Sequence, residues 1–163
     1  MKKLLSTLAV FALLVVSALG FTACGKKADT LKASDIVGDY TTTQVVFTAE
    51  GETESETKTR AEFLEIENPS LEYNKWYPFF SDYRATADGK LLEKDLDEAE
   101  AAYEAEEAYV ADWEVKNNTF SATQKSTPAG TTYSTVYNNG KIVTTVTIEG
   151  YGVAVITVEK VAA

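Results

Sequence analysis

The sequence predicts a mainly β fold, an antiparallel up-and-down barrel of about eight strands with one acidic amphipathic helix inserted mid-chain. Apolar and polar residues alternate with a period of two in most segments after residue 40, and threonine and valine, which favour strands, are common there. Short turn signals separate these segments. Such a sheet avoids exposed edges by closing into a barrel or by packing as a sandwich.

The first expected strand is 41–49, in which Val45 and Phe47 alternate with polar neighbours. Glu50-Gly51-Glu52 gives a turn, and alternation resumes over 53–66, which predicts a second strand. After residue 110 the pattern is strand throughout, and Asn139-Gly140 is the strongest short hairpin signal in the chain. Consecutive hairpins of this kind make an antiparallel meander. The later strands are expected at 112–116, 119–125, 131–137, 141–149 and 153–161.

Aromatic residues crowd the segment 71–83, where Pro78 argues against a regular helix or a central strand. Two interpretations remain open. The segment is either a loop that covers an opening with aromatic side chains, or ordinary core packing, which is the commoner role of aromatic clusters. Under the first interpretation, the candidate ligand-binding residues are Trp76, Tyr77, Phe79, Phe80 and Tyr83.

Residues 91–109 are expected to form the helix, because apolar residues recur there at three- and four-residue spacings. Acidic residues fill the other face, and Lys94 is the one base among them. This face is either a surface for a cation or basic partner or, as charge runs usually are, a solvated helix face.

The first 24 residues have the pattern of a cleaved export signal. Lys2 and Lys3 precede a nearly uninterrupted apolar run over 4–21, and Ala23 places a small residue before Cys24. This arrangement resembles the lipobox of bacterial lipoproteins. The resemblance implies a signal peptide at 1–23, a diacylglyceryl, palmitate-type anchor on Cys24 with a tether through residue 34, and an extracytoplasmic barrel domain at 35–163 on the cell membrane. An uncleaved membrane-spanning anchor is the alternative, with the same topology.

The composition excludes several classes of partner, catalytic mechanism and metal site. The formal net charge of −10 argues against nucleic acid as a partner, because phosphates require basic patches. The chain has no histidine, which excludes Ser-His-Asp and Cys-His catalysis and the usual zinc sites. Cys24 is the only cysteine, so no internal disulfide can form. An enzyme would need paired carboxylates, and none stands out. We therefore expect no catalytic residue, no metal site and no cofactor.

Several motifs in the mature part form a pattern. Gly38-Asp39-Tyr40 opens the first strand, Trp113-Glu114-Val115-Lys116-Asn117-Asn118 begins the later meander, and Ile156-Thr157-Val158-Glu159-Lys160 ends it. Together they resemble the lipocalin-like barrel domains of bacterial surface lipoproteins. The resemblance implies a barrel that holds a small ligand, with Tyr40 packing the base of the barrel. Tyr40 and Trp113 are secondary candidates for ligand contact.

The expected function is that of a non-catalytic, membrane-anchored lipoprotein that binds a small apolar or aromatic ligand in its barrel. The alternative is an envelope or surface module with a filled barrel that binds a protein partner. The fold alone does not choose between them.

Overall fold

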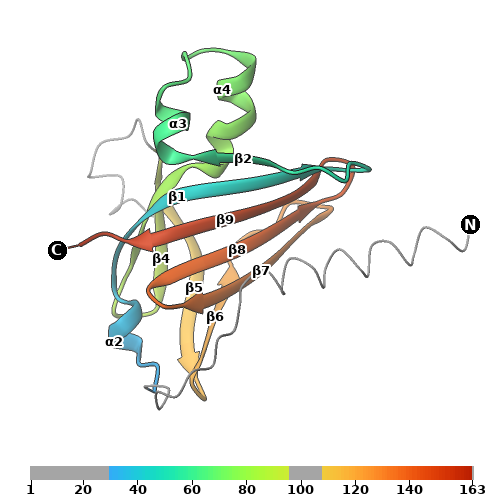
Figure 1. Cartoon of the computed structure of the whole chain (residues 1–163). Helices are drawn as coiled ribbons and strands as arrows, with labels where there is room; N and C mark the ends of the chain where they lie inside the picture. Colours follow the sequence, from blue (N-terminus) through green and yellow to red (C-terminus); the bar gives the residue numbers. More distant parts are fainter. Residues whose placement is uncertain (1–29, 96–107, 163) are drawn as a thin grey trace, which may run out of the picture.

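The structure, a computed structural model, describes residues 30–95 and 108–162, and this part of the chain is mainly β. Eight antiparallel strands form a nearly closed barrel, in the order β6-β5-β4-β3-β1-β9-β8-β7, and β2 pairs with β1 alone (Figure 1). The predicted fold class is confirmed. The strands are β1 (Gly38–Ala49), β2 (Glu56–Thr59), β3 (Ser81–Ala85), β4 (Lys90–Asp95), β5 (Tyr109–Lys116), β6 (Thr119–Gln124), β7 (Thr131–Asn138), β8 (Lys141–Ile148) and β9 (Gly152–Lys160).

The barrel strands follow one another around the wall in chain order, apart from β2. β9 pairs with β1 along nearly the whole of both strands, which joins the end of the domain to its beginning. The hydrogen-bonded order ends at β6 on one side and β7 on the other. The rings of Phe120 and Tyr137 lie 6.2 Å apart across this seam, so side chains bridge it.

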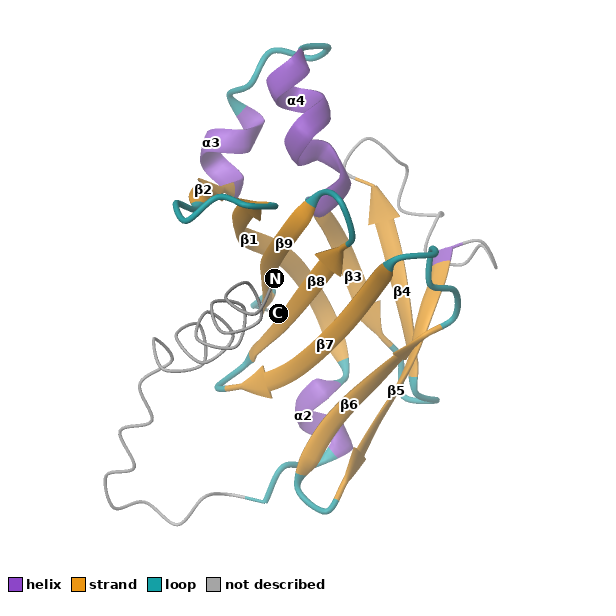
Figure 2. Ribbon diagram, turned by 90° about the vertical axis from the view of Figure 1, so that its right-hand side faces the viewer, coloured by secondary structure: helices purple, strands orange, loops and turns teal. Residues whose placement is uncertain are grey.

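β1 is the longest strand because it serves two neighbours on one edge. Its first residues, 38–41, pair with β3, and its later residues, 44–47, pair with β2. The chain returns from β2 to β3 through the short helices α3 (Arg60–Leu64) and α4 (Leu71–Trp76) and the 3₁₀ turn η1 (Tyr77–Phe79). Both helices stand at one end of the molecule, and α2 (Ala33–Ile36) lies at the other end (Figure 2).

The core consists of two clusters. The first, around α2, closes one end of the barrel with residues Ile36, Tyr40, Ala85, Trp113, Phe120, Ile142 and Val158. The second joins the later half of β1 to the helices, with residues Val45, Phe47, Phe63, Trp76, Phe79, Phe80 and Ala154. Ile156 packs against both clusters. The Tyr40 hydroxyl donates to the carbonyl of Ile36 at 2.6 Å, as expected of an aromatic residue at the base of the barrel.

Two expectations for the region before β3 were wrong. The predicted strand 53–66 is a strand only over β2, and α3 follows, with Thr59 and Glu62 forming a capping box at its start. Pro78 argues against a helix in the aromatic segment, yet α4 forms there, with the Ser70 side chain accepting a hydrogen bond from the Tyr73 amide. Pro78 lies beyond α4, in the first positions of η1, where its missing N–H costs no hydrogen bond.

The predicted helix 91–109 was wrong at both ends. Its first residues belong to β4, which pairs with β3 over 91–95 and with β5 over 90–92. Its last residue, Tyr109, begins β5. Hydrogen bonds to two neighbouring strands outweigh the weak helical spacing of this short apolar run. The middle of the predicted helix lies outside the described residues.

Candidate functional site

Four of the five predicted ligand residues lie together, at the helical end of the molecule. Trp76, Phe79 and Phe80 are buried, and Tyr77 packs against the same cluster. The Phe80 ring stacks on Phe63 with a centroid distance of 4.5 Å and an angle of 7° between the planes. These residues form core, as the second interpretation of the aromatic segment held. A role for them in ligand contact stays a prediction.

Tyr83, the fifth candidate, lies apart from the others on β3. It lies two residues from the buried Ser81 and two from the buried Ala85, on the same face of the strand, so its side chain points into the barrel. Glu93 of β4 stands directly opposite in the register, and the Tyr83 hydroxyl donates to Oε1 of Glu93 at 3.1 Å. Both side chains are half-buried. A carboxylate therefore projects from β4 into the interior.

Tyr133 reaches the same interior from another strand, which β5 and β6 separate from β4 around the wall. It lies on β7, and its partner in the register is Val146, a buried core residue of β8, so the two side chains share the inner face. Burial raises the pKa of the Tyr133 hydroxyl, and the nearby negative charge of Glu93 raises it further. The residue is nevertheless 37% exposed. We call Tyr83, Glu93 and Tyr133 the lumen group.

Hydroxyl groups continue this polar lining. The Thr135 and Thr144 side chains lie 3.1 Å apart on β7 and β8, in a directly opposed pair next to that of Tyr133. Thr42 of β1 is fully buried, and its hydroxyl donates to the Ser81 carbonyl at 2.9 Å. The middle of the barrel thus carries polar groups between two apolar clusters. Such a lining offers acceptors and aromatic faces to a small molecule.

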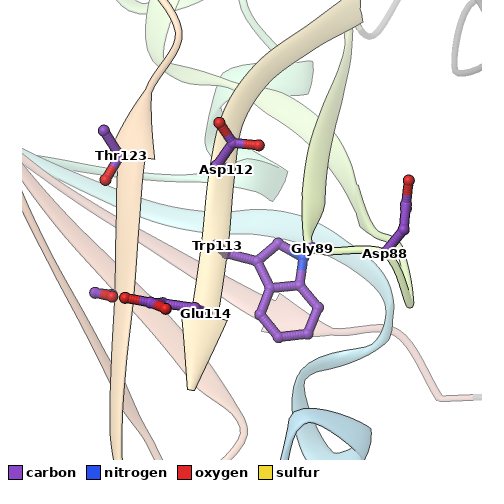
Figure 3. A pocket seen from close by; sticks show the side chains of 7 residues that line it. Asp88, Gly89, Asp112, Trp113, Glu114 and Thr123 are labelled. Atoms are coloured by element: carbon purple, nitrogen blue, oxygen red, sulfur yellow. The ribbon is translucent and has the colours of Figure 1, made fainter. Parts of the chain in front are cut away.

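A hollow on the outer face of the barrel has a volume of about 250 Å³. Its lining residues are Asp88, Gly89, Asp112, Trp113, Glu114, Ser121 and Thr123. Asp112 and Glu114 alternate with the inward-facing Trp113 and are exposed, opposite hydroxyl residues of β6 (Figure 3). The indole of Trp113 turns toward the Gly89 turn, and its Nε1 donates to the Lys90 carbonyl at 3.1 Å.

Two of the three acidic groups that line this outer hollow, Asp88 and Asp112, have partners. Asp88 pairs with Lys90 at 3.5 Å, and hydrogen bonding from Thr86 is the main reason that its pKa is lowered. Asp112 accepts a hydrogen bond from the Tyr109 hydroxyl, which raises the pKa of that tyrosine. Among residues 30–95 and 108–162, no three metal-ligating side chains gather closely enough to hold an ion. The hollow is a shallow acidic surface.

Sequence reasoning missed Glu93 and Tyr133. Glu93 was assigned to the acidic helix face, because Leu91-Leu92-Glu93 lacks the period of two that marks a strand. Tyr133 had a usable signal, since Tyr133, Thr135 and Tyr137 alternate along a predicted strand. That pattern identifies one face of β7, but the residue across the barrel from it depends on closure.

The fold and the residues that line its interior define a small antiparallel β-barrel with a cluster of polar side chains, the lumen group, in its interior. Comparisons with protein-family models, with curated proteins and with solved structures found no significant match to this chain. Within the described ranges, no helix has the length and apolar character needed to cross a membrane. Cys24 and the rest of the predicted signal lie outside those ranges.

Proposed function

We propose that this protein is a non-catalytic, extracytoplasmic lipoprotein, anchored to the cell membrane through Cys24, whose barrel binds a small molecule. The anchor rests on the sequence alone, on the basic start, the apolar run and the small residue before the cysteine. The absence of catalysis rests on the lack of histidine and of a distinct carboxylate pair in the sequence. The lipocalin-like resemblance of the barrel motifs points the same way.

One observation carries the binding proposal. Tyr133 points into the barrel, yet more than a third of the residue remains exposed. Barrels of about eight strands are either filled by their own side chains or hold one small ligand. In a filled barrel, an inward tyrosine would be covered like Tyr40, which is 1% exposed at the packed end. The unequal burial of these two inward rings favours an interior with room at the level of Tyr133.

The test is native mass spectrometry of the full-length protein, purified from cells in a mild detergent. A retained small molecule, released when the protein unfolds, is the expected result. Displacement of a fluorescent apolar probe from the same preparation gives a second measurement. A protein of bare polypeptide-plus-lipid mass that also fails to bind the probe would overturn the carrier function. The same spectrum measures the diacylglyceryl mass on Cys24 independently.

A second candidate, binding of a protein partner, is favoured by one observation. The helices α3 and α4 carry Leu64 and Leu71 at 62% and 91% exposure, on the part of the chain that projects beyond the barrel. Apolar side chains left exposed at a projecting end offer a surface that a partner could cover. A photo-crosslinking residue at position 71, compared with one at the exposed Glu114, tests this in cells. A distinct crosslinked protein specific to position 71 is expected, and equal patterns at both positions would contradict it.

A further inference from the structure

We propose that the lumen group is a binding site for a small organic amine, whose positive charge lies against the Glu93 carboxylate and between the rings of Tyr83 and Tyr133. This inference rests on the proposed function, because it assumes that the barrel holds a small molecule. It adds the charge of that molecule and the residues that recognise it.

The first argument is the state of Glu93. Its carboxylate accepts one hydrogen bond, from Tyr83, and lies in the barrel interior. In the part of the chain that the structure describes, six ion pairs form, and Glu93 belongs to none of them. An ammonium group would supply this carboxylate with an opposite charge and with hydrogen-bond donors. The same carboxylate would repel an anionic ligand.

The second argument is the pair of tyrosine rings. Tyr83 adjoins Glu93 on the neighbouring strand, and Tyr133 points into the same interior from β7, close enough for the charge of Glu93 to act on its hydroxyl. Aromatic faces attract ammonium groups, and the attraction is strongest where water is displaced. One carboxylate with two ring neighbours is a common way to surround an organic cation. Elsewhere on this protein, Lys125 Nζ already lies 4.4 Å from the centre of the Tyr109 ring.

The third argument separates an amine from a metal ion. Calcium takes six to eight oxygen ligands and magnesium demands a near-octahedral set. The lumen group offers one carboxylate and two phenols, which suits hydrogen bonding better than metal coordination. Beside these polar groups lie the apolar side chains of Val146 and Ile156, on the inner faces of β8 and β9. They provide an apolar surface for the body of the ligand.

The experiment compares two probes of nearly equal size, 2-phenylethylamine and its neutral counterpart 2-phenylethanol. Each is titrated into the full-length protein in detergent by calorimetry, with empty micelles as the blank. The variants are Glu93→Gln, which keeps shape and removes charge, and the matched control Glu114→Gln, which removes a charge from the outer face of β5. Melting temperatures verify that both variants are folded. Tyr133→Leu is a second, independent variant of the site.

We expect the amine to bind wild type more tightly than the alcohol. Glu93→Gln should weaken amine binding at least tenfold and leave the alcohol unchanged, whereas Glu114→Gln should change neither by more than twofold. Tyr133→Leu should weaken the amine at least threefold. Equal binding of both probes, unaffected by Glu93→Gln, would overturn the amine inference and leave the carrier function standing. Binding of neither probe would overturn the amine inference, and the native mass spectrum and the apolar probe would then decide the carrier function separately.

Discussion

Tyr83 and Glu93 face each other in direct register between β3 and β4, and the tyrosine hydroxyl donates to Glu93 Oε1 at 3.1 Å. Their side chains point into the barrel, so this hydrogen bond fixes the direction of the one carboxylate of the lumen group. A carboxylate held in one orientation inside a barrel is pre-organised for a ligand, which reduces the ordering cost of binding.

Removing the Tyr83–Glu93 hydrogen bond should lower the stability of the protein by a measurable amount. Tyr83→Phe is expected to lower the free energy of unfolding by about 1 kcal/mol, since a bond to a charged but half-buried group contributes that order. Urea unfolding measures the loss. In a double-mutant cycle with Glu93→Gln, the two effects should be coupled rather than additive. Tyr151→Phe, at an exposed turn, is the control and should change stability by less than about 0.5 kcal/mol. Additive effects would contradict the pairing.

The buried aromatic cluster makes a sharper prediction. Trp76 is 1% exposed and contacts Phe47 edge-to-face at a centroid distance of 6.5 Å. Trp76→Ala should lower the free energy of unfolding by about 3–5 kcal/mol, because it opens a cavity in the core. Leu71→Ala, in the same helix at 91% exposure, should change it by less than about 0.5 kcal/mol. Thermal unfolding distinguishes the two, and similar shifts would show that the helix is not packed as described.

Closure of the barrel depends on a close approach at Gly152. This residue has φ +139°, and a Cβ added to it would lie 2.2 Å from the Thr48 carbonyl oxygen of the paired strand β1. Gly152→Ala should therefore lower the free energy of unfolding by about 3 kcal/mol, from strain and overpacking together. Gly51→Ala also meets a positive φ, of +81°, but no atom lies within 4 Å. Its cost should be about 1 kcal/mol. Urea unfolding of both variants tests the difference.

The packed base of the barrel should limit stability at alkaline pH. Burial, and to a lesser degree the charge of Tyr137, raises the pKa of Tyr40 above its ordinary value near 10. The unfolded chain therefore loses this proton first, so the contribution of Tyr40 is complete below about pH 10 and is lost as the pH rises further.

Tyr40→Phe provides the test of this pH dependence. The variant should be less stable at pH 7 by about 1 kcal/mol, because the hydrogen bond to the Ile36 carbonyl is lost. Its free energy of unfolding should then decline less steeply than that of wild type from pH 10 upward. Unfolding in urea at a series of pH values measures both effects. Parallel declines for the two proteins would contradict the assigned cause.

Short-range sequence signals correctly predicted the hairpin turn and most of the strands. The turn at Asn139-Gly140 joins β7 to β8 with Asn138 opposite Lys141, as the hairpin signal indicated. Threonine-rich alternation predicted β1 and the last five strands. The helices α3 and α4 were not predicted, because segments of five and six residues are too short to show the periodicity of an amphipathic helix. Their caps, Thr59 with Glu62 and Ser70 before Tyr73, were the available signals.

Pairing between strands distant in sequence determines the two features that local patterns did not predict, β4 and the position of the lumen group. Leu91 and Leu92 fit a helical spacing as well as a strand, and only their pairing with β3 and β5 makes them β4. The site depends on the same closure. Glu93 lies 40 residues before Tyr133, and the two side chains share the interior because the sheet closes on itself between β6 and β7. No local sequence pattern indicates that Glu93 and Tyr133 lie close together. The ligand-site prediction therefore rested on the aromatic segment 71–83.

The most direct test of a ligand site inside the barrel is NMR of the full-length protein with ¹³C-labelled tyrosine rings, titrated with 2-phenylethylamine. Tyr83 and Tyr133 report on the lumen group, and Tyr109, which binds Asp112 at the outer hollow, reports on the exterior. Signals are assigned by Tyr→Phe substitution at each position. We predict saturable shifts of Tyr83 and Tyr133 with Tyr109 unchanged. Shifts of Tyr109 alone, or of no tyrosine, would contradict the account.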